Sequence, residues 1–245
     1  MVLINLYYLV VKEIFMNLNK LNNRYIKKLT LSDLKVLSEN IRHFLVETNS
    51  NTGGHIGANL GVIELSIALH YVFDSPKDSF IFDTGHIGYT HKILTGRAKL
   101  FETLNSFKGM NRFISPNESK HDKIESSHAG TSISTALGFA ISNKLKRNDK
   151  NTIAIIGDGA LCEGVALEAI NHAPKEKVNL LIVVNDNGFA ISKGYGAIHD
   201  MLSSQKNKSK NFFESLGYKI SGPIDGHNLN EIIKELKRYK RRGGV

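Results

Sequence analysis

The chain has a single cysteine, no apolar run long enough for a membrane span and no low-complexity stretch among its 245 residues. One cysteine, Cys162, excludes an internal disulfide and any metal site built from several thiolates, and it is consistent with the reducing cytoplasm. We expect Cys162 to be a small buried apolar side chain. The most apolar early segment, residues 2–11, is about half the length that spans a bilayer and lacks a preceding basic segment, so we expect no membrane anchor.

The length and composition favour one α/β domain. With 41% hydrophobic residues, the chain has enough apolar side chains for a single core. We interpret residues 1–20 as a poorly ordered N-terminal extension upstream of a start at Met16, and residues 21–245 as the domain itself.

Acidic residues are fewer than basic ones, 23 against 32, which gives a formal net charge of +9. The densest basic patch, residues 237–242, falls on a terminal helix and lacks the interleaved aromatic side chains of a single-strand binding platform. We therefore expect a solvated face and no nucleic-acid partner. Such a surface would still attract anionic cofactors and sugar phosphates.

Two short β-branched runs, residues 152–156 and 180–184, bracket a segment with helical apolar spacing at residues 160–172. This pattern predicts a strand, a helix and a second, parallel strand. Asp158 and Asn187 follow the two strands. We therefore expect both at the carboxyl edge of the sheet, where open α/β sheets bind ligands.

The residues at that edge suit a phosphorylated ligand and a hard cation. Gly157 and Gly159 let the backbone turn and approach a ligand closely, and the following helix would direct free N–H groups toward an anion. The carboxylate of Asp158 and the amide oxygen of Asn187 are oxygen donors of the kind that Mg²⁺ prefers.

Two common phosphate-binding motifs are excluded by this sequence. A Walker A loop needs Lys and Ser or Thr after its last glycine, but Val165 and Ala166 follow Gly164, and Cys162 stands where a dinucleotide fingerprint needs a small residue. The remaining pattern is GDG followed by NDN, with 187 − 158 = 29 residues between the aspartate and the last asparagine. This spacing resembles that of thiamine diphosphate enzymes, and it predicts Mg²⁺ ligands at Asp158, Asn187 and the carbonyl of Phe189.

Three histidines, His55, His86 and His128, each follow a Gly or Ser in a predicted turn. A turn exposes the side chain to a pocket, and histidine can transfer protons near neutral pH. A purely structural role is the alternative for each of them. No pair has the HExxH spacing of a helical zinc site.

Further motifs extend the resemblance to one family, 1-deoxy-D-xylulose-5-phosphate synthase. They are GGH at 53–55, DTGH at 83–86, HKILTGR at 91–97, SHAGTSIS at 127–134, EAINHA at 168–173 and GPIDGH at 222–227. The resemblance covers roughly residues 20–230 and only the cofactor-binding domain. It implies an α/β fold with a mostly parallel sheet flanked by helices, of the transketolase type.

The resemblance also implies the site residues. His55 and His86 would be catalytic, lying over the thiazolium ring and acting on protons or the substrate carbonyl. The implied contacts with thiamine diphosphate are His55, His128, Ala129, Gly130, Gly157, Asp158, Gly159, Ala160, Asn187 and Ile191.

By the same resemblance, the reaction joins a 2-oxo acid, pyruvate, to a sugar phosphate, glyceraldehyde 3-phosphate, with loss of CO₂. The family's pyrimidine-binding and C-terminal domains would be supplied by a second subunit, giving a hetero-oligomer. Two departures keep alternatives open: Gly188-Phe189-Ala190 follows the NDN, and the segment at 202–210 is short. These alternatives are the N-terminal subunit of a split transketolase and a non-catalytic cofactor-binding remnant.

Outside the central unit, apolar spacing predicts other elements. We expect a Ser-capped helix at about 31–48, and further helices at 61–73, 131–146 and 228–239. A strand at 79–83 and a strand edge near residue 220 complete the prediction.

Overall fold

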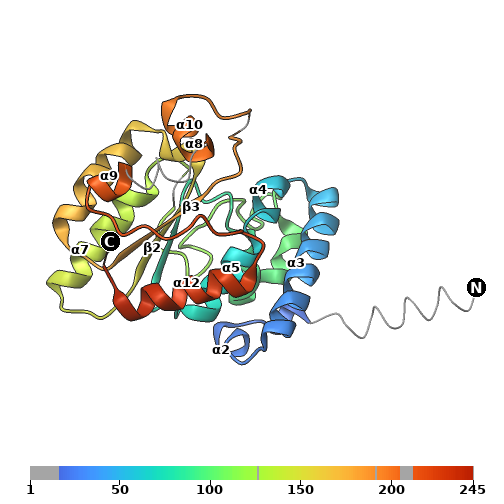
Figure 1. The fold of residues 1–245 in the computed structure, drawn as a ribbon. Helices are drawn as coiled ribbons and strands as arrows, with labels where there is room; N and C mark the ends of the chain where they lie inside the picture. Colours follow the sequence, from blue (N-terminus) through green and yellow to red (C-terminus); the bar gives the residue numbers. More distant parts are fainter. Residues whose placement is uncertain (1–16, 126, 191, 205–211, 245) are drawn as a thin grey trace, which may run out of the picture.

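The computed structural model of the chain describes residues 17–125, 127–190, 192–204 and 212–244 (Figure 1). The predicted extension up to residue 16 and the predicted cofactor contact at Ile191 lie outside these described residues. A short 3₁₀ turn, η1 (Leu18–Lys20), begins the described part.

Within the described residues, the sheet has three parallel strands in the order β1 (Ser79–Phe82), β2 (Thr152–Gly157) and β3 (Leu180–Asn185). In the register, Phe82 lies opposite Ile155, and Gly157 lies opposite Asn185. The three predicted strands and their parallel direction are confirmed. The carboxyl ends of β2 and β3 consequently meet at one edge.

Helices cover both faces of this sheet. The structure has these helices and helical turns besides η1: α2 (Asn23–Ile26), α3 (Leu31–Thr52), α4 (Ile56–Leu60), α5 (Ile63–Val72), α6 (Tyr89–Lys92), η2 (Ile93–Arg97), η3 (Ala98–Thr103), α7 (Ser132–Leu145), α8 (Asp158–Leu161), α9 (Gly164–Glu176), α10 (Ala197–Ser204) and α12 (Leu229–Arg242). In Figure 1, α7 and α9 lie on one side of the strands, α5 and α12 lie on the other, and α8 and α10 lie near one end.

Side chains alternate between these two layers because successive residues of a strand point to opposite faces. Ile153 and Ile155 of β2 join the larger core cluster with α3, α5 and α12. Ala154 and Ile156 join the second cluster with α7 and α9. The uninterrupted apolar run of β2 is thus explained by burial on both faces.

Several predicted boundaries are wrong in detail. Helix α3 is capped by Thr30, not by a serine: the Thr30 hydroxyl accepts from the Asp33 N–H, and the Asp33 carboxylate accepts from the Thr30 N–H. This reciprocal cap is the capping-box arrangement. The helix continues to Thr52 and ends at Gly53, whose φ is +71°.

The helix predicted at 61–73 is confirmed as α5, whereas the one predicted at 160–172 is divided. The helix predicted at 61–73 is preceded by the separate turn of α4, and the one predicted at 160–172 is interrupted where Glu163 adopts an extended conformation between α8 and α9. Cys162 lies in that interruption and is half-buried, not fully buried as predicted. Near residue 220, no strand forms within the part of the chain that the structure describes.

None of the helices among residues 17–125, 127–190, 192–204 and 212–244 is both long and apolar enough to cross a membrane.

Candidate functional site at the carboxyl edge of the sheet

Asp158 and Asn187 are brought to one edge, as predicted. Asp158 directly follows Gly157 of β2, and Asn187 lies two residues beyond Asn185, which pairs with Gly157. A Cβ on Gly159 would lie 2.8 Å from the Cβ of Ala190, so the segment after Asn187 packs directly on α8. A glycine is therefore required at position 159 for the two turns to meet.

Asp158 is a buried carboxylate without a full set of partners. Its side chain is 4% exposed, and its Oδ2 has no hydrogen bond from any described residue. Burial and the nearby charge of Asp186 raise its pKa. A buried oxygen in this state is costly unless a cation or donor satisfies it. The Asp158 carboxylate is thus suited to coordinate a cation.

The other predicted metal ligands lie in a tight turn. The side-chain oxygen of Asn187 accepts a hydrogen bond of 2.9 Å from the Phe189 N–H. Phe189 forms an isolated antiparallel bridge with Lys193, and its side chain is exposed. Carboxylate, amide and carbonyl oxygens together form the hard donor set that Mg²⁺ takes.

Sequence reasoning missed His199 at this edge. Helix α10 places its Nδ1 4.0 Å from Asp158 Oδ2, and the side chain is 8% exposed. A Cβ on Gly194 would overlap the imidazole of His199, so Gly194 makes room for it. A lone histidine that belongs to no recognised motif gives no signal in the sequence that could have found it.

His55 and His86 are close together. Their ring centroids are 5.3 Å apart. The fully buried side chain of Asn59 fixes both, because its Nδ2 donates to the carbonyl of His55 and to the carbonyl of His86, each at 2.8 Å. The Tyr89 hydroxyl accepts a bond of 3.3 Å from the His55 N–H. Two turns far apart in the sequence thereby present one pair of imidazoles.

Both imidazoles have free capacity for hydrogen bonding. The Nδ1 atoms of His55 and His86 are buried and have no hydrogen bond from any residue that the structure describes. Burial lowers the pKa of both rings; the charge of Arg112 adds to this effect at His55, and His55 adds to it at His86. Each ring is therefore neutral at pH 7 and can either accept or donate one proton.

Asp83, which follows β1, holds the turn at residues 128–130, which contains the predicted cofactor contacts His128, Ala129 and Gly130. Its carboxylate accepts hydrogen bonds of 3.0 Å from the N–H groups of Gly130 and Ser132. Gly130 has a φ of +80°, and a Cβ there would lie 2.7 Å from the Cβ of Glu163. The turn of His128, Ala129 and Gly130 is thus fixed between β1 and α9. The two N–H groups that Asp83 binds are not free for an anion.

A cleft of 540 Å³ opens beside this turn. It is lined by Phe113, Ile124, Glu125, Ser127, His128, Thr131 and Thr135. Phe113 belongs both to this cleft and to the histidine pair, since its ring centroid is 5.9 Å from that of His55. The wall of the cleft that Phe113 forms is therefore in contact with His55.

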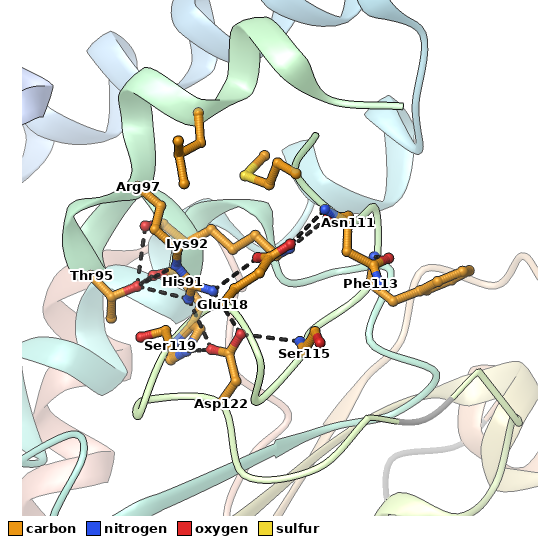
Figure 2. Close-up of polar contacts among 12 residues, drawn as sticks. His91, Lys92, Thr95, Arg97, Asn111, Phe113, Ser115, Glu118, Ser119 and Asp122 are labelled. Atoms are coloured by element: carbon orange, nitrogen blue, oxygen red, sulfur yellow. Dashed lines mark hydrogen bonds and ion pairs between the residues drawn. The ribbon is translucent and has the colours of Figure 1, made fainter. Parts of the chain in front are cut away.

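A buried polar network supports the loop that carries Phe113 (Figure 2). The Asp122 carboxylate accepts from Arg97 at 2.6 and 2.8 Å, from His91 Nε2 at 3.1 Å and from the Ser115 N–H at 3.1 Å. All these donors lie within the buried interior. These bonds hold the pKa of Asp122 well below its usual range, although burial by itself would raise it.

We expect Asp122→Ala to lower the free energy of unfolding by about 3–5 kcal/mol, because the buried Arg97 guanidinium loses its two short bonds to Asp122 and keeps, among the described residues, only the carboxylate contact of 3.3 Å with Glu118. The melting temperature should fall by roughly 10 °C at this chain length. A depressed carboxyl pKa gives stability that is present above the unfolded pKa of about 3.9 and is lost as the pH falls through the folded pKa. The difference from wild type should thus be constant between about pH 8 and pH 5 and shrink in stronger acid.

Thermal and urea unfolding across this pH range measure the effect. Asp149→Ala, which removes an exposed carboxylate before β2, serves as the matched control and should change stability by less than about 0.5 kcal/mol. Equal losses in both variants would show that the network does not stabilise the loop.

Comparison with known proteins places this geometry in a family. A family model described as 1-deoxy-D-xylulose-5-phosphate synthase matches residues 18–211 and 204–245. The synthase of Exiguobacterium sibiricum is 41% identical over 260 residues, which is 90% of this chain and 41% of that protein. The synthase of Listeria monocytogenes is 45% identical over 230 residues, or 90% of this chain and 38% of that protein. The chain thus spans about two fifths of the length of these curated relatives.

A solved transketolase mutant from Pichia stipitis, in complex with xylulose 5-phosphate, has a similar fold, with a TM-score of 0.70. It is 18% identical, and the alignment covers 85% of this chain and 34% of that one. The predicted transketolase-type α/β fold is therefore confirmed. With its central GDG and NDN segments, its histidine pair and the family match over nearly all of its described residues, the chain belongs to the 1-deoxy-D-xylulose-5-phosphate synthase family.

Proposed function

We propose that this chain binds the diphosphate half of thiamine diphosphate through Mg²⁺ and takes part in 1-deoxy-D-xylulose 5-phosphate synthesis from pyruvate and glyceraldehyde 3-phosphate, with release of CO₂. The observation that carries the proposal is the buried Asp158 carboxylate, whose free Oδ2 lies at the edge that also presents Asn187. Asp158, Asn187 and the carbonyl of Phe189 would hold the metal. When bound, the cofactor would supply a nucleophilic carbon for addition to the 2-oxo acid.

The chain's own residues have separate roles in this proposal. The neutral imidazoles of His55 and His86 hold or move a proton at the substrate carbonyl oxygen, since each has an Nδ1 that no described residue occupies. His128, Ala129 and Gly130 line the approach to the diphosphate. Gly157, Gly159 and Ala160 let the backbone of the GDG turn contact it.

The proposal favours the synthase over a split transketolase. The family model for the synthase covers the chain from residue 18 onward, whereas the likeness to the transketolase concerns the fold. The short segment at 202–210, which favoured the transketolase subunit, lies largely outside the described residues.

We expect the 245-residue chain, assayed by itself, to show no carboligase turnover and to gain it when a pyrimidine-binding domain is added. More than half of the length of the curated relatives has no counterpart in these residues. The described domain, with its three-stranded sheet, provides groups for the diphosphate end of the cofactor. The pyrimidine end of the cofactor would then be left in water.

Release of CO₂ from pyruvate measures turnover, and size-exclusion chromatography measures complex formation. Both are applied to the chain alone and to the chain mixed with the pyrimidine-binding domain of a relative. Turnover and a mixed complex would support the proposal. Turnover by the chain alone would refute the need for a partner, and cofactor binding without turnover in any mixture would favour the non-catalytic remnant.

A further inference from the structure

Arg112 is an exposed arginine beside the histidine pair, and the proposed reaction leaves it without a role. It lies on the loop between η3 and α7, immediately before Phe113. Among the described residues, no hydrogen bond or ion pair engages its guanidinium. An exposed arginine whose guanidinium has no partner among the described residues is suited to an anionic ligand, because its planar fork matches carboxylate and phosphate oxygens.

The backbone on both sides of Arg112 is fixed by buried groups (Figure 2). The Asn111 N–H donates to the Glu118 carboxylate at 2.5 Å, and the fully buried Lys92 donates to the Asn111 carbonyl at 2.5 Å and to Glu118 at 2.6 Å. The Phe113 N–H donates to the Asn111 side chain at 2.9 Å. The backbone of Arg112 is thus fixed before a ligand binds. Less conformational entropy of the chain is therefore lost on binding.

This held segment faces His55. The ring centroid of Phe113 is 5.9 Å from that of His55, and in Figure 2 the Phe113 ring points away from the buried network. The positive charge of Arg112 also acts on His55. Burial lowers the pKa of His55, and the charge of Arg112 lowers it further. At Tyr89, burial raises the pKa of the hydroxyl, and the charge of Arg112 acts in the opposite direction.

No carboxylate among the residues that the structure describes pairs with the Arg112 guanidinium. Glu125, which lines the cleft, accepts instead from the Ser115 hydroxyl at 3.0 Å and from the Asn111 amide at 3.4 Å. Glu118 is taken by Lys92, Arg97 and Asn111. Glu118 and Glu125 are therefore both engaged elsewhere, and the positive charge of Arg112 is available to a ligand beside His55.

We propose that Arg112 binds the oxyanion of a substrate whose carbonyl group lies at His55 and His86. This assignment rests on the proposed function, in which one substrate carries a carboxylate and the other a phosphate. The guanidinium would form a two-pronged contact with either group and hold the reacting carbonyl against the imidazoles. The cofactor's diphosphate, at the Asp158 edge, is not its ligand.

The test is titration of the 245-residue chain, without cofactor, with pyruvate and separately with inorganic phosphate, followed by the imidazole NMR signals of His55 and His86. We expect Arg112→Ala to weaken binding of at least one anion by roughly tenfold or more, the loss typical of a hydrogen bond to a charged group, and Arg112→Lys to weaken it less. Arg241→Ala, at the exposed end of α12, is the matched control and should bind as wild type does.

If Arg112→Ala loses only pyruvate binding, the ligand of Arg112 is the carboxylate. If it loses only phosphate binding, the ligand is the phosphate group. If it loses both, the two anions share the site. The inference is overturned if wild type binds neither anion at millimolar concentrations, or if Arg112→Ala and Arg241→Ala bind both anions equally well. A separate titration with Mg²⁺ and thiamine diphosphate keeps the two proposals distinct. If wild type fails there, the proposed function fails; if wild type and Arg112→Ala bind the cofactor equally, only the anion results decide the role of Arg112.

Discussion

Replacing Asp158 by alanine is expected to abolish Mg²⁺-dependent binding of thiamine diphosphate. The variant loses the one charged oxygen donor in the proposed ligand set, a change on the order of 4 kcal/mol, which corresponds to about a thousandfold in affinity. A thermal-shift titration with cofactor and Mg²⁺ measures this as the loss of the ligand-induced rise in melting temperature.

The variant should remain folded without ligand. In the wild type, Asp158 is buried, its Oδ2 has no hydrogen bond from the residues described, and Asp186 raises its pKa together with burial. A raised carboxyl pKa means that the ionised form destabilises the fold at pH 7, so alanine should leave the apo melting temperature unchanged or higher. Asp149→Ala, at the opposite end of β2, controls for loss of a carboxylate and should bind normally. Unchanged cofactor binding by Asp158→Ala would be fatal to the metal assignment.

Replacing His55 or His86 by alanine is expected to reduce turnover by about 10²–10⁴-fold in a reconstituted complex, while cofactor affinity changes far less. Each imidazole would act on the reacting carbonyl, and an interaction made in the transition state lowers turnover without changing ground-state binding. The two side chains are 5.3 Å apart by ring centroids, so their effects should not be additive.

Steady-state turnover and calorimetric cofactor affinity, measured on the same samples, separate the two roles. His172→Ala removes an exposed histidine of α9 that pairs with Glu176, and it should retain full turnover. If His55→Ala or His86→Ala keeps near wild-type turnover but loses cofactor binding, the role assigned to that residue is wrong.

The central unit was predictable because it is local. Each of its strands is a short β-branched run, and Asp158 and Asn187 follow the ends of neighbouring parallel strands, so topology alone brings them to one edge. The pairing of His55 with His86 was suggested by the family resemblance and not by any pattern. The structure supplies the physical reason, which is the buried side chain of Asn59 that bonds both backbones.

Features that depend on contacts between distant segments could not be predicted in this way. Asp83 reads as the last polar residue of a strand, yet its carboxylate fixes the turn at Gly130 and Ser132. Arg97 and Asp122 are 25 residues apart and have no shared periodicity. The break at Cys162 and Glu163 lies within an apolar spacing that continues on both sides, so periodicity predicted one helix where backbone geometry gives two.

Isothermal titration of the wild-type chain with thiamine diphosphate, in the presence of Mg²⁺ and again in excess EDTA, tests the central claim most directly. The account predicts saturable binding with one site per chain in Mg²⁺ and loss of binding in EDTA, because the Asp158 carboxylate and the diphosphate are both anionic and need the cation between them. Equal binding in both conditions, or no binding in either, would contradict it.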